Sequence, residues 1–215
     1  MPNKEQLYPF ALTTLDRVKD KLGLDKPNMD LVLTRMINSA TDYIENECNR
    51  RFLETAYTNE LYSIFGDSIT ILMLKQAPVT VLGNIQYRQG LIGSPTWVNY
   101  TNNDFEIIGD GSAGLIKFYT YLNLGLPKGT NVVRVASYTA GYKIDFKNIG
   151  DTTKHTLPGD LSELTEKLVI KAYQRRLTPG KSSETFNGAS ITWTKDLDAE
   201  DKNVLSFYRR LQPFM

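Results

Sequence analysis

The stretch MDLVLTRMINSATDYIENECNRRF, residues 29–52, carries the strongest periodic signal in the chain. Apolar residues recur along it at steps of three and four, which is typical of the buried face of an amphipathic helix. We expect this helix to start from a cap at Asp25 or Asn28 and to form a core element. The residues predicted to point inward are Met29, Val32, Leu33, Met36, Ile37, Ala40, Tyr43, Ile44 and Cys48.

The polar end of this stretch holds Cys48, the only cysteine of the chain. Its neighbours are an acid, an amide and two arginines, so the thiol could be a nucleophile, a metal ligand or part of a helix end. Cys48 lies one helical turn after Ile44 on the apolar stripe, which favours a small buried side chain. We expect Asp42, Glu45, Asn46 and Asn49 to point outward, and Arg50 and Arg51 to benefit from the helix dipole.

Patterns in the rest of the chain place helices at both ends and strands in the middle. Helical signals cover residues 13–22, with Thr13 as cap, then 158–177 and 198–211. Short alternating segments separated by turn residues fill 57–142, and 56–64 with 68–75 are predicted to pair as a hairpin. The expected class is α+β, with a bundle of about four helices from both chain ends and a large antiparallel β insertion. The predicted divisions are 1–55 (N-terminal helices), 56–145 (β insertion), 146–195 (third helix with the following loop or hairpin) and 196–215 (C-terminal helix or arm).

Charge and composition exclude several classes of function. Lys plus Arg total 25 against 24 Asp plus Glu, so the net charge of +1 gives no general attraction to nucleic acid or acidic membranes. Apolar runs are short, and the N-terminus lacks the apolar core of a secretory signal. We expect a cytoplasmic protein without an internal disulfide.

Three motifs resemble chemical sites but have simpler explanations. Gly109, Gly111 and Gly114 match the spacing of a dinucleotide-binding loop, yet a strand pattern follows where that site needs a helix. The acidic run 196–201 lacks the glycine and the glutamate of a calcium loop, so a helix cap is favoured. His155 is a single histidine far in sequence from Cys48. We therefore expect no catalytic, cofactor or metal site, and no enzyme.

The last segment, SFYRRLQPFM, interleaves aromatic residues with arginines. Both residue types anchor protein interfaces, which favours an arm that binds a partner. A helix folded onto its own domain explains the same pattern equally well. The candidate arm residues are Val204, Phe207, Tyr208, Arg209, Arg210, Leu211 and Phe214.

Taken in order, six blocks resemble the head-tail connector (adaptor) proteins of tailed bacteriophages. They are LTTLDRVKDKLGL, LTRMINSATDYIENECNRRF, PVTVLGNI, VVRVASYTAGY, LPGDLSELTEKLVIKAY and SFYRR, and together they span most of the chain. Residues 89–128 depart from the family's compact members, because their loops and strands are longer.

The resemblance implies an adaptor in the virion neck, assembled in the host cytoplasm. Such proteins form a ring, usually of twelve subunits, between the portal protein and a stopper or tail-completion protein, around a channel for the genome. It implies that the C-terminal segment docks on the portal, that contact with DNA is non-specific, and that no membrane is involved. In such a ring, we expect Glu45, Arg50 and Arg51 to pair across a subunit boundary.

Two other functions remain open on the sequence alone. A monomeric β-rich module could bind carbohydrate or protein through Trp97, Tyr100 and Tyr119. A small hydrolase could use carboxylates that the fold brings together.

Overall fold

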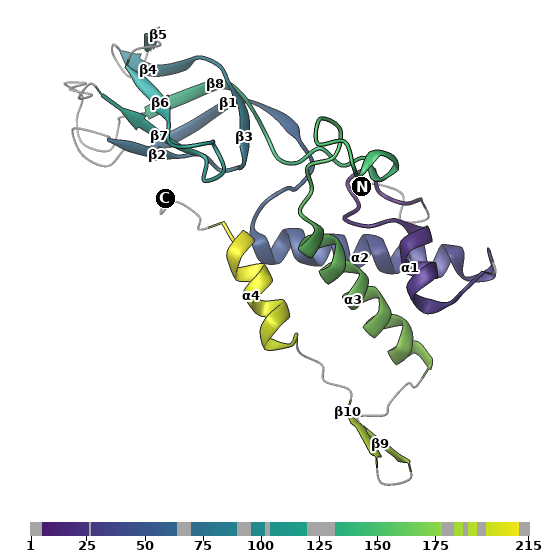
Figure 1. Ribbon diagram of the computed structural model, residues 1–215. Coiled ribbons are helices and arrows are strands. Elements are labelled where there is room, and N and C mark those ends of the chain that lie inside the picture. The colour runs from purple at the N-terminus through teal and green to yellow at the C-terminus, as the bar shows by residue number, and fades with distance from the viewer. Residues whose placement is uncertain are drawn as a thin grey trace. The chain divides into compact units, whose positions relative to one another are not determined.

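The computed structural model describes residues 6–25, 27–63, 70–89, 96–101, 104–119, 132–177, 183–186, 189–192 and 197–210 (Figure 1). The chain divides into two compact units. The helical unit comprises Met1–Arg50 and Lys143–Arg209, and the β unit comprises Arg51–Tyr142 and Arg210–Met215. Helices come from both chain ends and antiparallel sheets from the middle, so the α+β class is confirmed.

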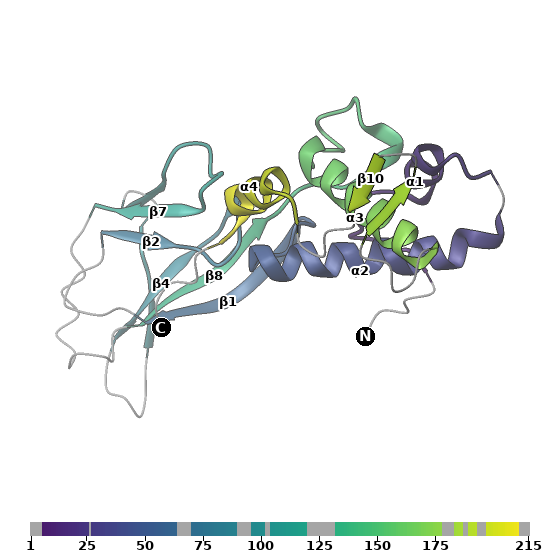
Figure 2. The ribbon, with the colours of Figure 1, turned by 90° about the horizontal axis from the view of Figure 1, so that it is seen from below.

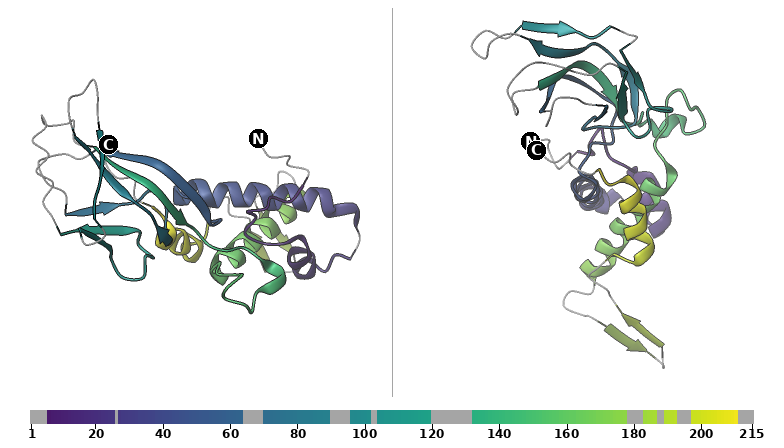
Figure 3. Two further views of the ribbon diagram at one scale, coloured as in Figure 1. Left: turned by 90° about the horizontal axis from the view of Figure 1, so that it is seen from above. Right: turned by 90° about the vertical axis from the view of Figure 1, so that its left-hand side faces the viewer.

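The long helix α2, Asp30–Cys48, packs against α3, Gly159–Leu177 (Figure 3). The helical unit also contains the shorter helices α1, Leu15–Leu22, and α4, Ala199–Tyr208. Short 3₁₀ turns cover Pro27–Met29 and Phe146–Asn148, and the strands β9, Ser183–Phe186, and β10, Ala189–Thr192, form a hairpin. The core of the unit includes Leu33, Ile37 and Val169.

Both predicted N-terminal caps lie at other residues. Thr14, not Thr13, caps α1 by accepting a hydrogen bond from the backbone amide of Arg17, and Gly23 ends the helix at φ 64°. The cap of α2 is Met29 rather than Asp25 or Asn28, because the 3₁₀ turn Pro27–Met29 leads directly into the helix.

The buried face of α2 includes fewer residues than its apolar pattern predicts. Leu33, Ile37, Ile44 and Cys48 are buried as predicted. Tyr43 is 41% exposed, which contradicts its predicted place in the core. A periodic stripe shows which side of a helix is apolar, but only neighbouring elements decide how much of that side is covered.

Two antiparallel sheets form the β unit. In the larger sheet, β8, Val132–Ala140, pairs along its length with β1, Thr55–Ser63 (Figure 2). On its other side β8 pairs with β3, Val79–Leu82, and β4, Ile85–Gln89, and β4 pairs with β5, Thr96–Asn99. The smaller sheet has the order β2, Ile71–Met73, then β7, Leu115–Phe118, then β6, Phe105–Ile107. Both sheets contribute to one core that contains Leu74, Ile85, Ile116, Val133 and Tyr138.

The predicted hairpin of residues 56–64 and 68–75 is wrong. The first segment, β1, pairs with β8, whereas β2 pairs with β7. The nine-residue strand β8 buries alternate residues and can pair with β1 along its whole length. The strand β2 has only three residues and is too short to do so.

Candidate interaction sites

The C-terminal helix α4 packs on its own unit. Leu205 and Tyr208 are buried, and the Tyr208 hydroxyl donates a hydrogen bond to the Asp160 carboxylate, 2.9 Å from Oδ1 and 3.0 Å from Oδ2. The described part of the SFYRR segment thus belongs to a helix folded onto its own unit, and partner binding by its exposed residues remains a prediction. The candidate arm residue Tyr208 is therefore buried within the helical unit.

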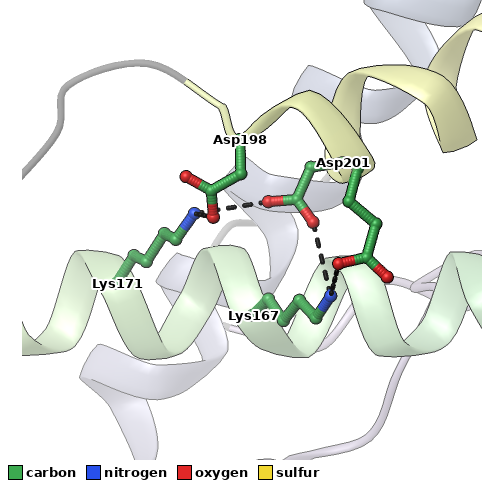
Figure 4. A network of polar contacts seen from close by, with 5 residues as sticks. Lys167, Lys171, Asp198 and Asp201 are labelled. Carbon is green, nitrogen blue, oxygen red and sulfur yellow. Dashed lines mark hydrogen bonds and ion pairs between the residues drawn. The ribbon is translucent and has the colours of Figure 1, made fainter.

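Ion pairs hold the start of α4 against α3 (Figure 4). Lys171 Nζ lies 2.8 Å from Asp198 Oδ2 and 3.3 Å from Asp201 Oδ2, and Lys167 Nζ lies 3.4 Å from Asp201 Oδ1. The hydrogen bond between Lys171 and Asp198 raises the pKa of the lysine and lowers the pKa of the carboxyl. The side chain of Asp201 is only 3% exposed, so the carboxylate that joins the two helices is largely shielded from water.

The other candidate arm residues have different surroundings. Phe207 is 81% exposed, Arg209 is exposed and Val204 is half-buried. Arg210 belongs to the β unit, where its guanidinium donates to the carbonyl oxygens of Ala113 and Leu74. Leu211 and Phe214 lie outside the described residues. Phe207 and Arg209 are therefore the arm residues whose exposure leaves them open to a partner.

The candidate subunit-interface residues also differ in exposure. Glu45 is 3% exposed and Arg50 is 8% exposed, whereas Arg51 is exposed. The outward direction predicted for Glu45 is therefore wrong. Asn49 adopts φ 50°, and this left-handed turn brings the amide of Arg50 to 3.2 Å from the Glu45 carbonyl oxygen. Pairing across a subunit boundary remains a prediction, and Arg51 is its accessible member.

Cys48 is a core residue, as predicted. Its side chain is fully buried, and Sγ donates to the carbonyl oxygen of Leu205 at 3.7 Å. Burial raises the pKa of the thiol to about 11, and the charge of Arg50 lowers it only in part. The thiolate that nucleophilic or metal chemistry needs is disfavoured at this position.

The glycine motif forms the predicted loop between strands. Gly109, Gly111 and Gly114 connect β6 to β7, each with positive φ, at 67°, 81° and 59°. The amide of Val79 donates to the Gly111 carbonyl oxygen at 2.9 Å, so a neighbouring strand passes close to this loop. A side chain at Gly111 would collide with the Val79 carbonyl. These glycines serve backbone geometry rather than phosphate binding.

The three aromatics of the alternative ligand site do not form one platform. Tyr100 is 9% exposed and packs within the aromatic core. The guanidinium of Arg134 lies 4.2 Å from the ring centroid of Trp97, and the amine of Lys117 lies 5.1 Å from that of Tyr119. The tyrosine that would complete a stacking surface is thus part of the core.

The described residues contain neither a metal-binding cluster nor a membrane-spanning helix. No group of three or more His, Cys, Asp or Glu in those ranges could hold a metal ion. No helix in the described part of the chain is long and apolar enough to cross a membrane. His155 accepts a hydrogen bond at Nδ1 from the Asp145 amide, and burial lowers its pKa, so this imidazole serves the loop around residues 145–155.

A groove between α2 and α3 is the feature that the sequence did not predict. It has a volume of about 390 Å³. Sequence reasoning assigned its α2 residues Val32, Met36 and Tyr43 to the core, so the signal was present but was interpreted as a closed contact. The lining residues are Val32, Arg35, Met36, Ser39, Ala40, Tyr43, Leu168 and Ala172.

One known protein family matches the first part of the chain. Residues 12–89 match the family model described as phage gp6-like head-tail connector protein. The resemblance to head-tail connector proteins is confirmed. The matched residues carry α1, α2 and the strands β1 to β4, so the match includes parts of both units.

Solved structures share the fold over nearly the whole length of this chain. A chain from "Neck of empty GTA particle computed with C6 symmetry" matches with a TM-score of 0.54 at 16% identity, covering 100% of this chain and 97% of that one. A chain from "Virion of native gene transfer agent (GTA) particle" matches with a TM-score of 0.51 at 14% identity, covering 99% and 96%. No curated protein matches the chain.

Proposed function

We propose that this protein is the adaptor subunit of a phage head-tail connector, located in the virion neck. It forms a homo-oligomeric ring, of twelve subunits as in its family, beneath the portal and joins the DNA-filled head to the stopper or tail. The observation that carries the proposal is the connector match over residues 12–89. A fold shared over the full chain with a particle's neck protein supports it.

A structural rather than an enzymatic role agrees with the chemistry of the chain. The thiol is buried and the glycine motif is a strand connection, so the residues that suggested catalysis have structural roles. With a net charge of +1, contact with genomic DNA in the channel would be non-specific and would depend on charges repeated around a ring. Assembly in the host cytoplasm follows from this role.

Portal binding by the C-terminal segment remains part of the proposal. Among the described residues, exposure favours Phe207 and Arg209 as the contributing side chains, and Val204 is half-buried. An exposed arginine suits an interface because its planar guanidinium can form paired hydrogen bonds with carboxylates.

The test uses purified portal rings of the same phage. Negative-stain images of portal mixed with this protein should show added ring-shaped density on one face of the portal. Images without added density, together with no co-sedimentation of the two proteins, would refute the adaptor role.

A charge-reversal pair tests the portal contact. Arg209→Glu should weaken portal binding, whereas Lys202→Glu, at another exposed position of α4, should leave it unchanged. Equal binding by both variants would remove Arg209 from the portal site.

A further inference from the structure

Helix α2 carries more apolar surface than its own chain covers. Leu31 is 45% exposed and Tyr43 is 41% exposed, and between them Val32 and Met36 line the groove against Leu168 of α3. Large apolar side chains that cluster beside an open groove indicate a surface that another molecule covers.

Helix α4 carries an exposed aromatic side chain that could enter such a groove. Phe207 is 81% exposed, the highest value among the exposed large hydrophobic residues of the described chain. Glu200, whose side chain is 84% exposed, precedes it by two helical turns on the same face of α4. The outer face of α4 therefore carries an aromatic ring and, about 10 Å away along the axis, a carboxylate.

We propose that the groove between α2 and α3 receives Phe207 from α4 of a second copy of this chain. The proposal rests on the ring-forming adaptor function above and assigns its subunit contact. Because Phe207 is largely exposed in its own chain, it does not fill the groove of that chain. The groove volume of about 390 Å³ accommodates an aromatic side chain with part of the helix that carries it.

Charge supports one orientation of the inserted helix. Arg35 lines the groove beside Met36, while Tyr43 lies about two turns further along α2. With Phe207 of the incoming helix near Tyr43, Glu200 lies at about the right distance to meet Arg35. The contact would then combine an aromatic anchor with an ion pair at its edge.

The two halves of this contact lie on different elements of one unit. A projection on α4 and a groove on α2 and α3 make a head-to-tail interface, in which each copy uses both surfaces with different neighbours. Such an interface produces a closed ring when the rotation between neighbours permits, whereas a twofold contact would stop at a dimer. This geometry favours a second copy over the portal as the partner of Phe207.

Cross-linking of mixed cysteine variants tests the proposal. Asn203 is exposed and lies one turn before Phe207 on the same face of α4, so it can carry a thiol while Phe207 stays in place. Asn203→Cys and Ser39→Cys proteins, mixed at high concentration and treated with a short bis-maleimide, should give a covalent dimer that neither variant gives alone. Lys202→Cys is the matched control, because it is exposed on another side of α4 and should not cross-link to Ser39→Cys. Absence of the mixed dimer, or equal dimer formation by the control, would overturn the proposal.

Assembly measurements separate this proposal from the adaptor function. Phe207→Ser should keep the circular dichroism spectrum of the parent protein and weaken self-association roughly 30-fold, as loss of a central aromatic anchor does. If Phe207→Ser still forms normal rings on the portal, the groove contact is wrong and the adaptor role stands. If Phe207→Ser self-associates normally but loses portal binding, Phe207 belongs to the portal arm instead. If the parent protein forms no ring with or without the portal, the adaptor role itself fails.

Discussion

Glu166 shows how a single charge can tie distant helices together. Its fully buried carboxylate on α3 accepts hydrogen bonds from Thr13 Oγ1 and Arg17 Nε, both at 2.7 Å from Oε1, and pairs with Lys21 Nζ at 2.5 Å from Oε2. Burial alone would raise the pKa of Glu166, but hydrogen bonds from Lys21 and Thr13 and the charges of Arg17 and Lys21 outweigh it and lower the pKa. The charged form therefore belongs to the folded state.

Replacing this carboxylate should change both stability and its pH dependence. Because the folded pKa lies below the unfolded one, Glu166 contributes stability above its unfolded pKa, and this contribution is lost as the pH falls through the folded value. Glu166→Gln should lower the free energy of unfolding by about 1–3 kcal/mol at pH 7, because Arg17 and Lys21 are partly exposed and remain solvated. In urea unfolding at pH 7 and pH 3, the free energy of unfolding should fall less on acidification for the variant than for the parent protein.

Glu163→Gln is the control for this measurement, since Glu163 is an exposed carboxylate on the same helix. Its unfolding curves should follow those of the parent protein at both pH values. An unchanged acid sensitivity in Glu166→Gln would contradict the role assigned to the buried carboxylate.

Cys48 should react slowly with thiol reagents in the folded protein. Its side chain is fully buried and its pKa of about 11 leaves little thiolate at pH 8. Absorbance with a chromogenic disulfide should show slow modification in buffer and fast modification in denaturant. Asn46→Cys combined with Cys48→Ala places a thiol at an exposed position of the same helix and should react rapidly. Rapid modification of native Cys48 would mean that the end of α2 opens.

At the scale of elements, local sequence and long-range contacts have separate effects. The left-handed residues Gly23 and Asn49 end α1 and α2 through local backbone geometry. The attachment of α4 instead depends on α3, because Lys167 and Lys171 supply the cations for Asp198 and Asp201. The acidic run at 196–201 thus marks both a helix start and a docking contact.

The two acids of α4 should differ in their effect on this helix. Asp201→Ala removes a buried carboxylate that two lysines share and should cost about 1–3 kcal/mol. Asp198→Ala removes an exposed partner of Lys171 and should cost less than about 1 kcal/mol. Amide hydrogen exchange in α4 should become much faster in the first variant only. Equal exchange in both variants would show that apolar contacts alone hold the helix.

Two glycines of the loop between β6 and β7 differ in the space around them, so their alanine variants serve as test and control. Gly111→Ala should destabilise the β unit by at least about 3 kcal/mol, because the new methyl group would meet the Val79 carbonyl and φ is 81°. Gly109→Ala has open space around it and φ 67°, so backbone strain of about 1 kcal/mol is expected. Thermal unfolding of both variants measures the difference, and similar melting temperatures would contradict the close approach at Gly111.

For the whole molecule, the burial of α4 decides whether its deletion is tolerated. Leu205 and Tyr208 are buried in the helical unit, and Asp201 joins α4 to α3, so α4 is part of the domain. Because this helix packs on its own unit, it can present only its outer face, with Phe207 and Arg209, to partners. Portal binding and subunit contact must therefore be separated by point variants rather than by removal of the helix.

Deletion of residues 204–215 should destabilise the helical unit. Loss of the buried Leu205 and Tyr208 is expected to cost at least about 3 kcal/mol. The circular dichroism melting temperature should fall by more than 5 °C, since 1 kcal/mol shifts the midpoint of a domain of this size by about 2–4 °C. A truncated protein that melts like the full chain would show that α4 adds nothing to the domain.

The sequence by itself determined the α+β class, the helical content of both chain ends, the buried position of Cys48 and the glycine loop before β7. These features depend on short-range periodicity, capping and backbone geometry, which neighbouring residues set. Only the tertiary structure decided that β1 pairs with β8, that Glu45 and Tyr208 are buried, and that Tyr43 borders an open groove. Those outcomes depend on which surfaces meet across many residues of chain, and an apolar stripe carries no information about its partner.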